Sequence, residues 1–180
     1  MQPIFRTAFG ALLVLCGAAD AAAEQEWSHG DWHASKNGNF CAIWTGSDGK
    51  GTFSIELDTG GFDASATYLP VWYRGHTAPL RLNDRIALVI DDHETWLSEE
   101  MGMVDGEDEW GEYYVAASLT AGFVPELIDV LKRSDRLDVR RRRSGGETVT
   151  IDDFSLRGFT ATLLKIAEWC RFDPADLPTS

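Results

Sequence analysis

The chain is poor in positive charge. Its 180 residues include 16 Lys and Arg against 29 Asp and Glu, which gives a formal net charge of −13 at pH 7. Nucleic acids and anionic membrane surfaces would repel a protein of this charge, so neither is expected as a partner. Such a charge favours solubility, and it also permits a cationic protein partner.

Long hydrophobic runs are also missing, apart from a short one near the first residue. Arg6 precedes an apolar run over residues 8–19, and Ala21-Ala22-Ala23 then offers an A-x-A cleavage site. The run is too short to span a bilayer, so membrane insertion is not expected. We predict a signal peptide over residues 1–23, a single β-rich domain over residues 24–180, and a periplasmic or secreted location.

Cysteine is scarce. The sequence has three cysteines, and cleavage after residue 23 would leave only Cys41 and Cys170. An even pair in an exported protein favours a disulfide. Cys170 also continues a helical stripe with Phe159, Leu163 and Ile166, which places it toward the core. We therefore predict a Cys41–Cys170 disulfide that ties the last helix to the first hairpin. Two buried free thiols are the alternative, and a metal-binding pair is disfavoured because the cleaved chain has no further cysteine and no histidine at close spacing to complete the site.

What the sequence does contain is a repeated strand pattern. Residues 52–58 alternate apolar and polar side chains, which is typical of a half-exposed antiparallel strand. Asn37-Gly38 separates two strand-like segments and predicts a tight hairpin turn. Residues 24–31 are expected to be frayed, and helices are expected after Pro125 and over residues 159–170. The predicted fold class is α+β, with mainly antiparallel, sandwich-like β structure and two short helices, the second of them C-terminal.

Motifs that assemble a catalytic site are absent from the sequence. It has no Gly-x-Ser-x-Gly, no His-Glu-x-x-His and no paired Cys-His nucleophile. Ser47 and Lys50 have Ser-x-x-Lys spacing, but the glycines around them disfavour the helix that this motif requires. The remaining catalytic hypothesis is a small hydrolase that uses an acid pair from Asp91, Asp92 and Glu94.

Metal ligands and basic patches are equally sparse. His29 and His33 would share a face if they lay on one strand, but exposed surface histidines are the ordinary interpretation. Residues 105–112 carry oxygen ligands at alternate positions but depart from the EF-hand pattern. No cofactor is predicted, with Ca²⁺ at residues 105–112 as the alternative. Residues 140–143 are four arginines, expected in a solvated, ion-paired hairpin because neighbouring strand side chains face opposite ways.

Acidic residues are concentrated in residues 99–112, which we expect to form a glycine-punctuated loop between two strands. The loop holds seven carboxylates together with Trp110. Charge of this density suits a cationic partner, and an aromatic side chain supplies the desolvated contact that charge alone cannot. The predicted partner-binding residues are Glu107, Asp108, Glu109 and Trp110.

One short stretch resembles a known family. Phe154-Ser155-Leu156-Arg157-Gly158-Phe159-Thr160-Ala161 looks like the C-terminal signature of the invasion-associated locus B family of exported bacterial proteins. An ending of strand, glycine, helix and cysteine is also similar to that of small periplasmic proteins that accompany type VI secretion. The resemblance covers about residues 115–170. It implies a β-sandwich-like export domain without a known active site, and no catalytic residue carries over.

Three functions remain as hypotheses. The first is a non-catalytic periplasmic or secreted, envelope-associated binding protein with a cationic protein partner. The second is an acidic inhibitor of a basic enzyme such as a lysozyme, with residues 99–112 as the plug. The third is the small hydrolase. The absence of an assembled catalytic motif favours binding over catalysis.

Overall fold

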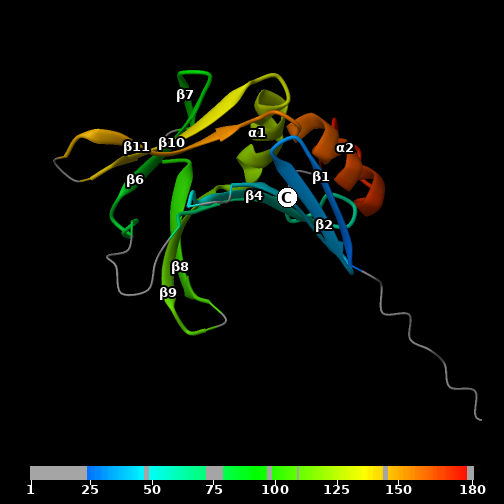
Figure 1. Ribbon diagram of the computed structural model, residues 1–180, viewed down its shortest axis with the longest axis horizontal. Helices are drawn as coiled ribbons and strands as arrows, with labels where there is room; N and C mark the ends of the chain where they lie inside the picture. Colours follow the sequence, from blue (N-terminus) through cyan, green and yellow to red (C-terminus); the bar gives the residue numbers. More distant parts are fainter. Residues whose placement is uncertain are drawn as a thin grey trace, which may run out of the picture.

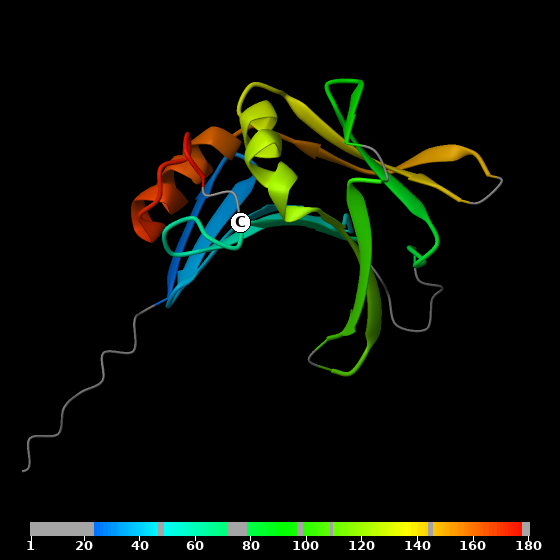
Figure 2. The same cartoon turned by 180° about the vertical axis from the view of Figure 1, so that it is seen from behind.

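The computed structural model describes residues 24–46, 49–71, 79–96, 99–108, 110–143 and 146–177. These residues form two antiparallel sheets and two short α-helices (Figures 1 and 2). This confirms the predicted fold class. The predicted signal peptide and the Ser47 position lie outside the described residues.

The larger sheet, sheet A, forms an arch. Its seven strands follow the order β1-β2-β3-β4-β5-β9-β8. In both views the arch has β4 near its top, with the β1–β2 and β8–β9 hairpins descending on opposite sides (Figures 1 and 2). The strands are β1 (Gln25–His29), β2 (Trp32–Asn37), β3 (Phe40–Thr45), β4 (Thr52–Asp58), β5 (Ser65–Leu69), β8 (Met101–Glu107) and β9 (Tyr113–Leu119).

The smaller sheet and the helices lie over the convex side of the arch (Figures 1 and 2). Sheet B has the order β11-β10-β6-β7. Its strands are β6 (Arg85–Ile90), β7 (His93–Trp96), β10 (Arg136–Arg142) and β11 (Thr148–Ser155). The helices are α1 (Val124–Leu131), which follows the 3₁₀ turn η1 (Ala121–Phe123), and α2 (Phe159–Cys170).

Alternation along the strands explains where the core lies. In β4, Phe53, Ile55 and Leu57 are buried toward the convex side, as their spacing predicts. The ring of Phe53 lies 6.4 Å from that of Phe154 in sheet B, measured between centroids. Trp32, fully buried on β2, packs edge-on against Phe159 of α2. One core therefore joins both sheets and the last helix.

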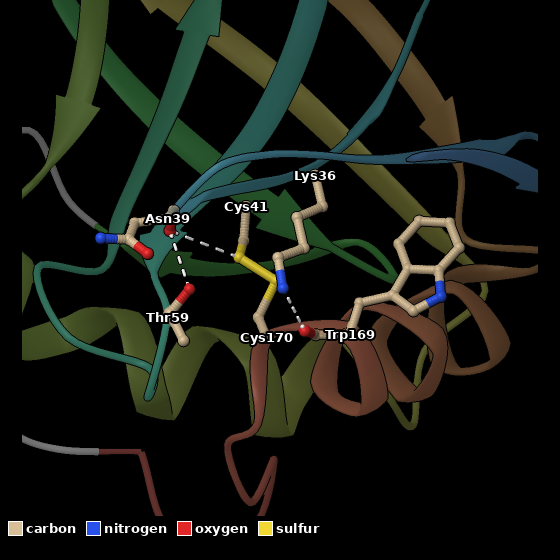
Figure 3. Close-up of a disulfide and its surroundings, with 6 residues drawn as sticks. All are labelled: Lys36, Asn39, Cys41, Thr59, Trp169 and Cys170. Carbon is tan, nitrogen blue, oxygen red and sulfur yellow. Dashed lines mark hydrogen bonds between the residues drawn. A yellow bond between two sulfur atoms is a disulfide. The ribbon is translucent and has the colours of Figure 1, made fainter. Parts of the chain in front are cut away.

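The Cys41–Cys170 disulfide is present and confirms the prediction (Figure 3). Both cysteines are fully buried, and the bond fixes the end of α2 to β3. The last carbonyls of α2 also have partners: Lys36 Nζ donates to Trp169 O at 2.6 Å, and Gly60 N donates to Cys170 O at 2.7 Å. A cation at a helix C-terminus is favourable because unpaired carbonyls concentrate negative charge there.

Two glycines set the position at which α2 begins. Gly30 in the β1–β2 turn and Gly158 before α2 both have positive φ, at 60° and 101°. Their backbones are in close contact: a Cβ on Gly158 would lie 2.0 Å from His29 O. Asp31 N donates to Arg157 O at 2.9 Å across the same junction. Only residues without a side chain allow this approach.

Two segments differ from the sequence-based expectation. Residues 24–31 are not frayed, because Gln25–His29 pairs along its whole length with β2. Residues 99–112 are not a loop, because Met101–Glu107 forms β8 and pairs with all of β9. In both cases pairing with a neighbouring strand supplies the order that the polar or glycine-rich local sequence does not.

Candidate binding surface

Three of the four predicted partner-binding residues, Glu107, Asp108 and Trp110, lie at the tip of the β8–β9 hairpin. Glu107 ends β8 and is exposed, while Asp108 and Trp110 lie in the turn. Glu109 lies outside the described residues. The hairpin descends from the arch, away from sheet B and both helices (Figures 1 and 2). It therefore presents its tip to solvent and to any partner.

Asp108 holds the turn in place. Its Oδ1 accepts hydrogen bonds from Trp110 N at 3.0 Å and from Glu112 N at 2.8 Å. Asp108 N also donates to Glu112 O at 3.0 Å, and Gly111, with a φ of 74°, completes the turn. Asx-type bonding of this kind fixes a local backbone conformation. Trp110 is thus 78% exposed on an ordered turn.

Carboxylates line the distal part of the hairpin. Asp105 and Glu107 point to the same side of β8, as alternation requires, and both are exposed. Within the described part of the chain, neither forms an ion pair with Lys or Arg. Desolvation, together with the hydrogen bond to Asp105, raises the pKa of the Tyr113 phenol above its ordinary value. Asp105 and Glu107 therefore keep their negative charge unneutralised by a neighbouring Lys or Arg among the described residues.

The concave side of sheet A forms a second surface, which we call the outer face. Residues that are paired across neighbouring strands point to the same face of a sheet, so the strand register shows which residues lie on the outer face. None of these positions on the seven strands carries Lys or Arg; Lys36, the one lysine in these strands, points to α2 instead. The outward residues include Glu26, His33, Trp44, Ser54, Glu56, Asp58, Thr67, Leu69, Val104, Tyr114, Ala116 and Ser118.

A pocket of about 400 Å³ lies in the outer face where β4, β5, β9 and β8 adjoin. It is lined by Thr52, Ser54, Glu56, Thr67, Leu69, Val104, Tyr114 and Ala116. Gly106 makes one wall possible: a Cβ there would lie 2.8 Å from the Tyr114 hydroxyl oxygen, so the Tyr114 ring covers this glycine. The pocket combines one carboxylate, several hydroxyls and an apolar wall, a mixture typical of ligand sites.

A second hollow, of about 470 Å³, lies beside the β1–β2 turn. Its charged groups are already paired: Lys50 Nζ lies 3.1 Å from Asp153 Oδ1, and an Arg157 guanidinium nitrogen lies 2.9 Å from Asp31 Oδ1. A hydrogen bond from Ser155, and to a smaller extent one from Arg157, holds the pKa of Asp31 below its ordinary value. The Lys50 contact joins the β3–β4 connection to β11, and the Asp31 contacts join the β1–β2 turn to the end of β11 and to Arg157, so we assign this region to structure rather than binding.

Two acids of the hydrolase hypothesis, Asp91 and Asp92, lie in one turn of sheet B. Asp91 and Asp92 form the β6–β7 turn with φ values of 47° and 65°. The Asp91 carboxylate accepts hydrogen bonds from Asp135 N and Arg136 N, at 3.1 and 3.0 Å to Oδ1. The Asp92 side chain is 90% exposed, and that of Glu94 lies outside the described residues. Asp91 therefore holds the connection between α1 and β10 against the β6–β7 turn.

The histidines and arginines also have separate positions. His29 stacks on Trp27 on the α2 side of β1, whereas His33 stacks on Trp44 on the outer face. Arg140 and Arg142 share the outer side of sheet B, and Arg141 points inward, where it donates to Pro79 O at 2.6 Å. Among the described residues, no three His, Cys, Asp or Glu side chains come together as metal ligands.

No protein-family model matches the chain, and no curated protein matches it either. None of the helices in the described parts of the chain combines the length and apolar character needed to cross a bilayer.

The sequence analysis identified the hairpin tip as a candidate binding site but did not identify the pocket. One sequence feature relates to the pocket: the outward positions of residues 52–58 include Ser54, Glu56 and Asp58, and no basic residue lies among them.

Proposed function

We propose that this chain is a non-catalytic, envelope-associated binding protein, exported to the periplasm or beyond the cell, that recognises a cationic protein through the β8–β9 hairpin. The observation that carries the proposal is Trp110, 78% exposed on an ordered turn beside Glu107 and Asp108. Tryptophan is enriched among the residues that anchor protein–protein interfaces, and carboxylates beside it add complementarity to a cationic partner.

Charge and apolar contact have different tasks in this proposal. The exposed carboxylates of Asp105 and Glu107 attract a cationic partner over a distance, which raises the association rate. Trp110 then supplies the buried contact that slows dissociation. A net charge of −13 extends the same field over the whole molecule.

Export and family membership belong to the proposal as well. The predicted signal peptide over residues 1–23 and the buried Cys41–Cys170 disulfide support a location outside the cytoplasm. The stretch from Phe154 to Ala161 supports a relation to the invasion-associated locus B family. Inhibition of a basic enzyme such as a lysozyme is the second candidate, favoured by the β8–β9 hairpin, which projects from the arch (Figures 1 and 2).

Neutralising the hairpin tip should abolish most partner capture without unfolding the protein. The variant Glu107→Gln, Asp108→Asn, Glu109→Gln removes three charges, and the amide introduced by Asp108→Asn keeps an oxygen that accepts the turn's hydrogen bonds. We expect basic proteins from a periplasmic extract to be retained by immobilised wild type at low salt and lost from the variant.

A matched control neutralises three exposed acids elsewhere, Glu24→Gln, Asp63→Asn and Asp176→Asn, and makes the same change in net charge. This control should retain the basic proteins almost as well as wild type. Equal retention by the hairpin variant and the control, or no retention by wild type, would contradict the proposed function.

Trp110→Ala should weaken binding mainly through faster dissociation. Loss of a central aromatic contact costs about 2 kcal/mol or more, or roughly 30-fold in affinity. The denaturation midpoint should not change, because the side chain has few folded-state contacts at 78% exposure. Leu164→Ala on α2, 56% exposed and far from the hairpin in sequence, is the control. Leu164→Ala should bind the captured partner like wild type. If Trp110→Ala does so as well, Trp110 is not the anchor.

A further inference from the structure

The pocket in the outer face contains a carboxylate with no cationic partner among the described residues. Glu56 accepts one hydrogen bond, from Ser54 Oγ at 3.3 Å, and it is only half-exposed. No outward position of sheet A holds Lys or Arg that could reach it. A partly desolvated carboxylate gains more from a cation than a fully solvated one, because screening by water is weaker there.

The rest of the pocket suits the remainder of a long basic side chain. Leu69 and Val104, which are 40% and 44% exposed, form an apolar wall against which a methylene stem can lie. The Tyr114 ring covers Gly106 and lines the pocket, and the face of such a ring attracts a cation. Thr67 and Ser54 add hydroxyl oxygens that accept hydrogen bonds.

We propose that this pocket binds the ammonium or guanidinium group of a Lys or Arg side chain presented by the cationic partner, with Glu56 as the counter-ion. The inference rests on the proposed function and adds the chemistry of a second contact on the same molecule. Anionic ligands would be repelled from the pocket, because Glu56, Glu26 and Asp58 lie on the same face. A second copy of this chain, placed face to face, would bring these like charges together.

A volume of about 400 Å³ is near the lower end of the range for small-ligand sites, about 300–1,000 Å³, and leaves room for one long side chain with part of its backbone. A neutral ligand such as a sugar would use the hydroxyls and Tyr114 but not the charge of Glu56. The charge dependence of binding therefore separates the two ligand classes.

The test is an NMR titration of the mature protein with short synthetic peptides that differ at one central residue: Arg, Lys or citrulline, the uncharged isostere of Arg. We expect the Arg and Lys peptides to shift the amide signals of Glu56, Thr67 and Ala116. The citrulline peptide should bind about tenfold more weakly, the scale of one charge-assisted hydrogen bond.

Two variants complete the experiment. Glu56→Gln should weaken the Arg and Lys peptides about tenfold, whereas Glu26→Gln on the same face should leave their affinity within about twofold. Equal binding of the Arg and citrulline peptides, full binding by Glu56→Gln, or no shift at these amides with wild type overturns the proposal.

The hairpin variant should still show the same pattern of shifted pocket amides. Loss of partner capture by that variant would keep the hairpin function in place even if the pocket proposal failed.

Discussion

Removal of the Cys41–Cys170 disulfide is expected to lower the free energy of unfolding by up to about 5 kcal/mol. The bond closes a loop with a sequence separation of 129 residues, and chain-entropy arguments assign about this value to loops of that length. Cys41→Ala with Cys170→Ala should therefore unfold at a much lower denaturant concentration than wild type. Chemical denaturation of the mature protein, with and without reductant, measures the difference.

Thiol titration provides the control for that experiment. Denatured, unreduced mature protein should contain no free thiol, because Cys41 and Cys170 are bonded. The double variant should be insensitive to reductant, while reduced wild type should approach its stability. Two titratable thiols, or a denaturation midpoint unchanged by reductant, would contradict the role of the disulfide in fixing α2 to β3.

Gly158→Val is expected to destabilise the protein by more than about 3 kcal/mol. A β-branched residue at a φ of 101° is strained by about 1–3 kcal/mol. A second cost is added because the new Cβ would lie 2.0 Å from His29 O and 3.1 Å from Gly30 Cα. Both atoms belong to backbone, which cannot move without separating α2 from the β1–β2 turn.

Two other glycines separate these causes. Gly38 also has positive φ, at 60°, but a Cβ there would meet nothing within 4 Å, so Gly38→Val reports strain alone. Gly122 has neither feature, and Gly122→Val should change stability least. Denaturant midpoints should fall in the order Gly122→Val, Gly38→Val, Gly158→Val. A Gly158→Val midpoint equal to that of Gly38→Val would show that the close backbone contact contributes nothing.

The parts of this fold that the sequence predicts are those with strong local signals. The alternation of Phe53, Ile55 and Leu57 identifies β4, and Asn37-Gly38 identifies a hairpin turn. The stripe that ends at Cys170 identifies the buried side of α2. Each signal is a property of a short segment, so no knowledge of distant contacts is needed.

The missed elements depend on distant contacts. β8 contains Gly102 and Gly106, which suggest a loop, but Gly106 lies beneath the Tyr114 ring of β9 and so is compatible with a strand. The pocket arises where β5 pairs with β9, which places Thr67 beside Ser118. That register is set by tertiary packing, so Glu56 and Tyr114 could not be assigned to one site from their spacing.

Association kinetics test the central claim, recognition of a cationic partner by the β8–β9 hairpin, most directly. The association rate constant of the captured partner is measured for wild type and for the variant Glu107→Gln, Asp108→Asn, Glu109→Gln across a range of salt concentrations. Screening lengths fall from about 30 Å at 0.01 M to about 8 Å at 0.15 M, so we expect the wild-type rate to fall steeply with salt. The variant should associate slowly at low salt and depend little on salt. Equal association rates for the two proteins at low salt would contradict the account.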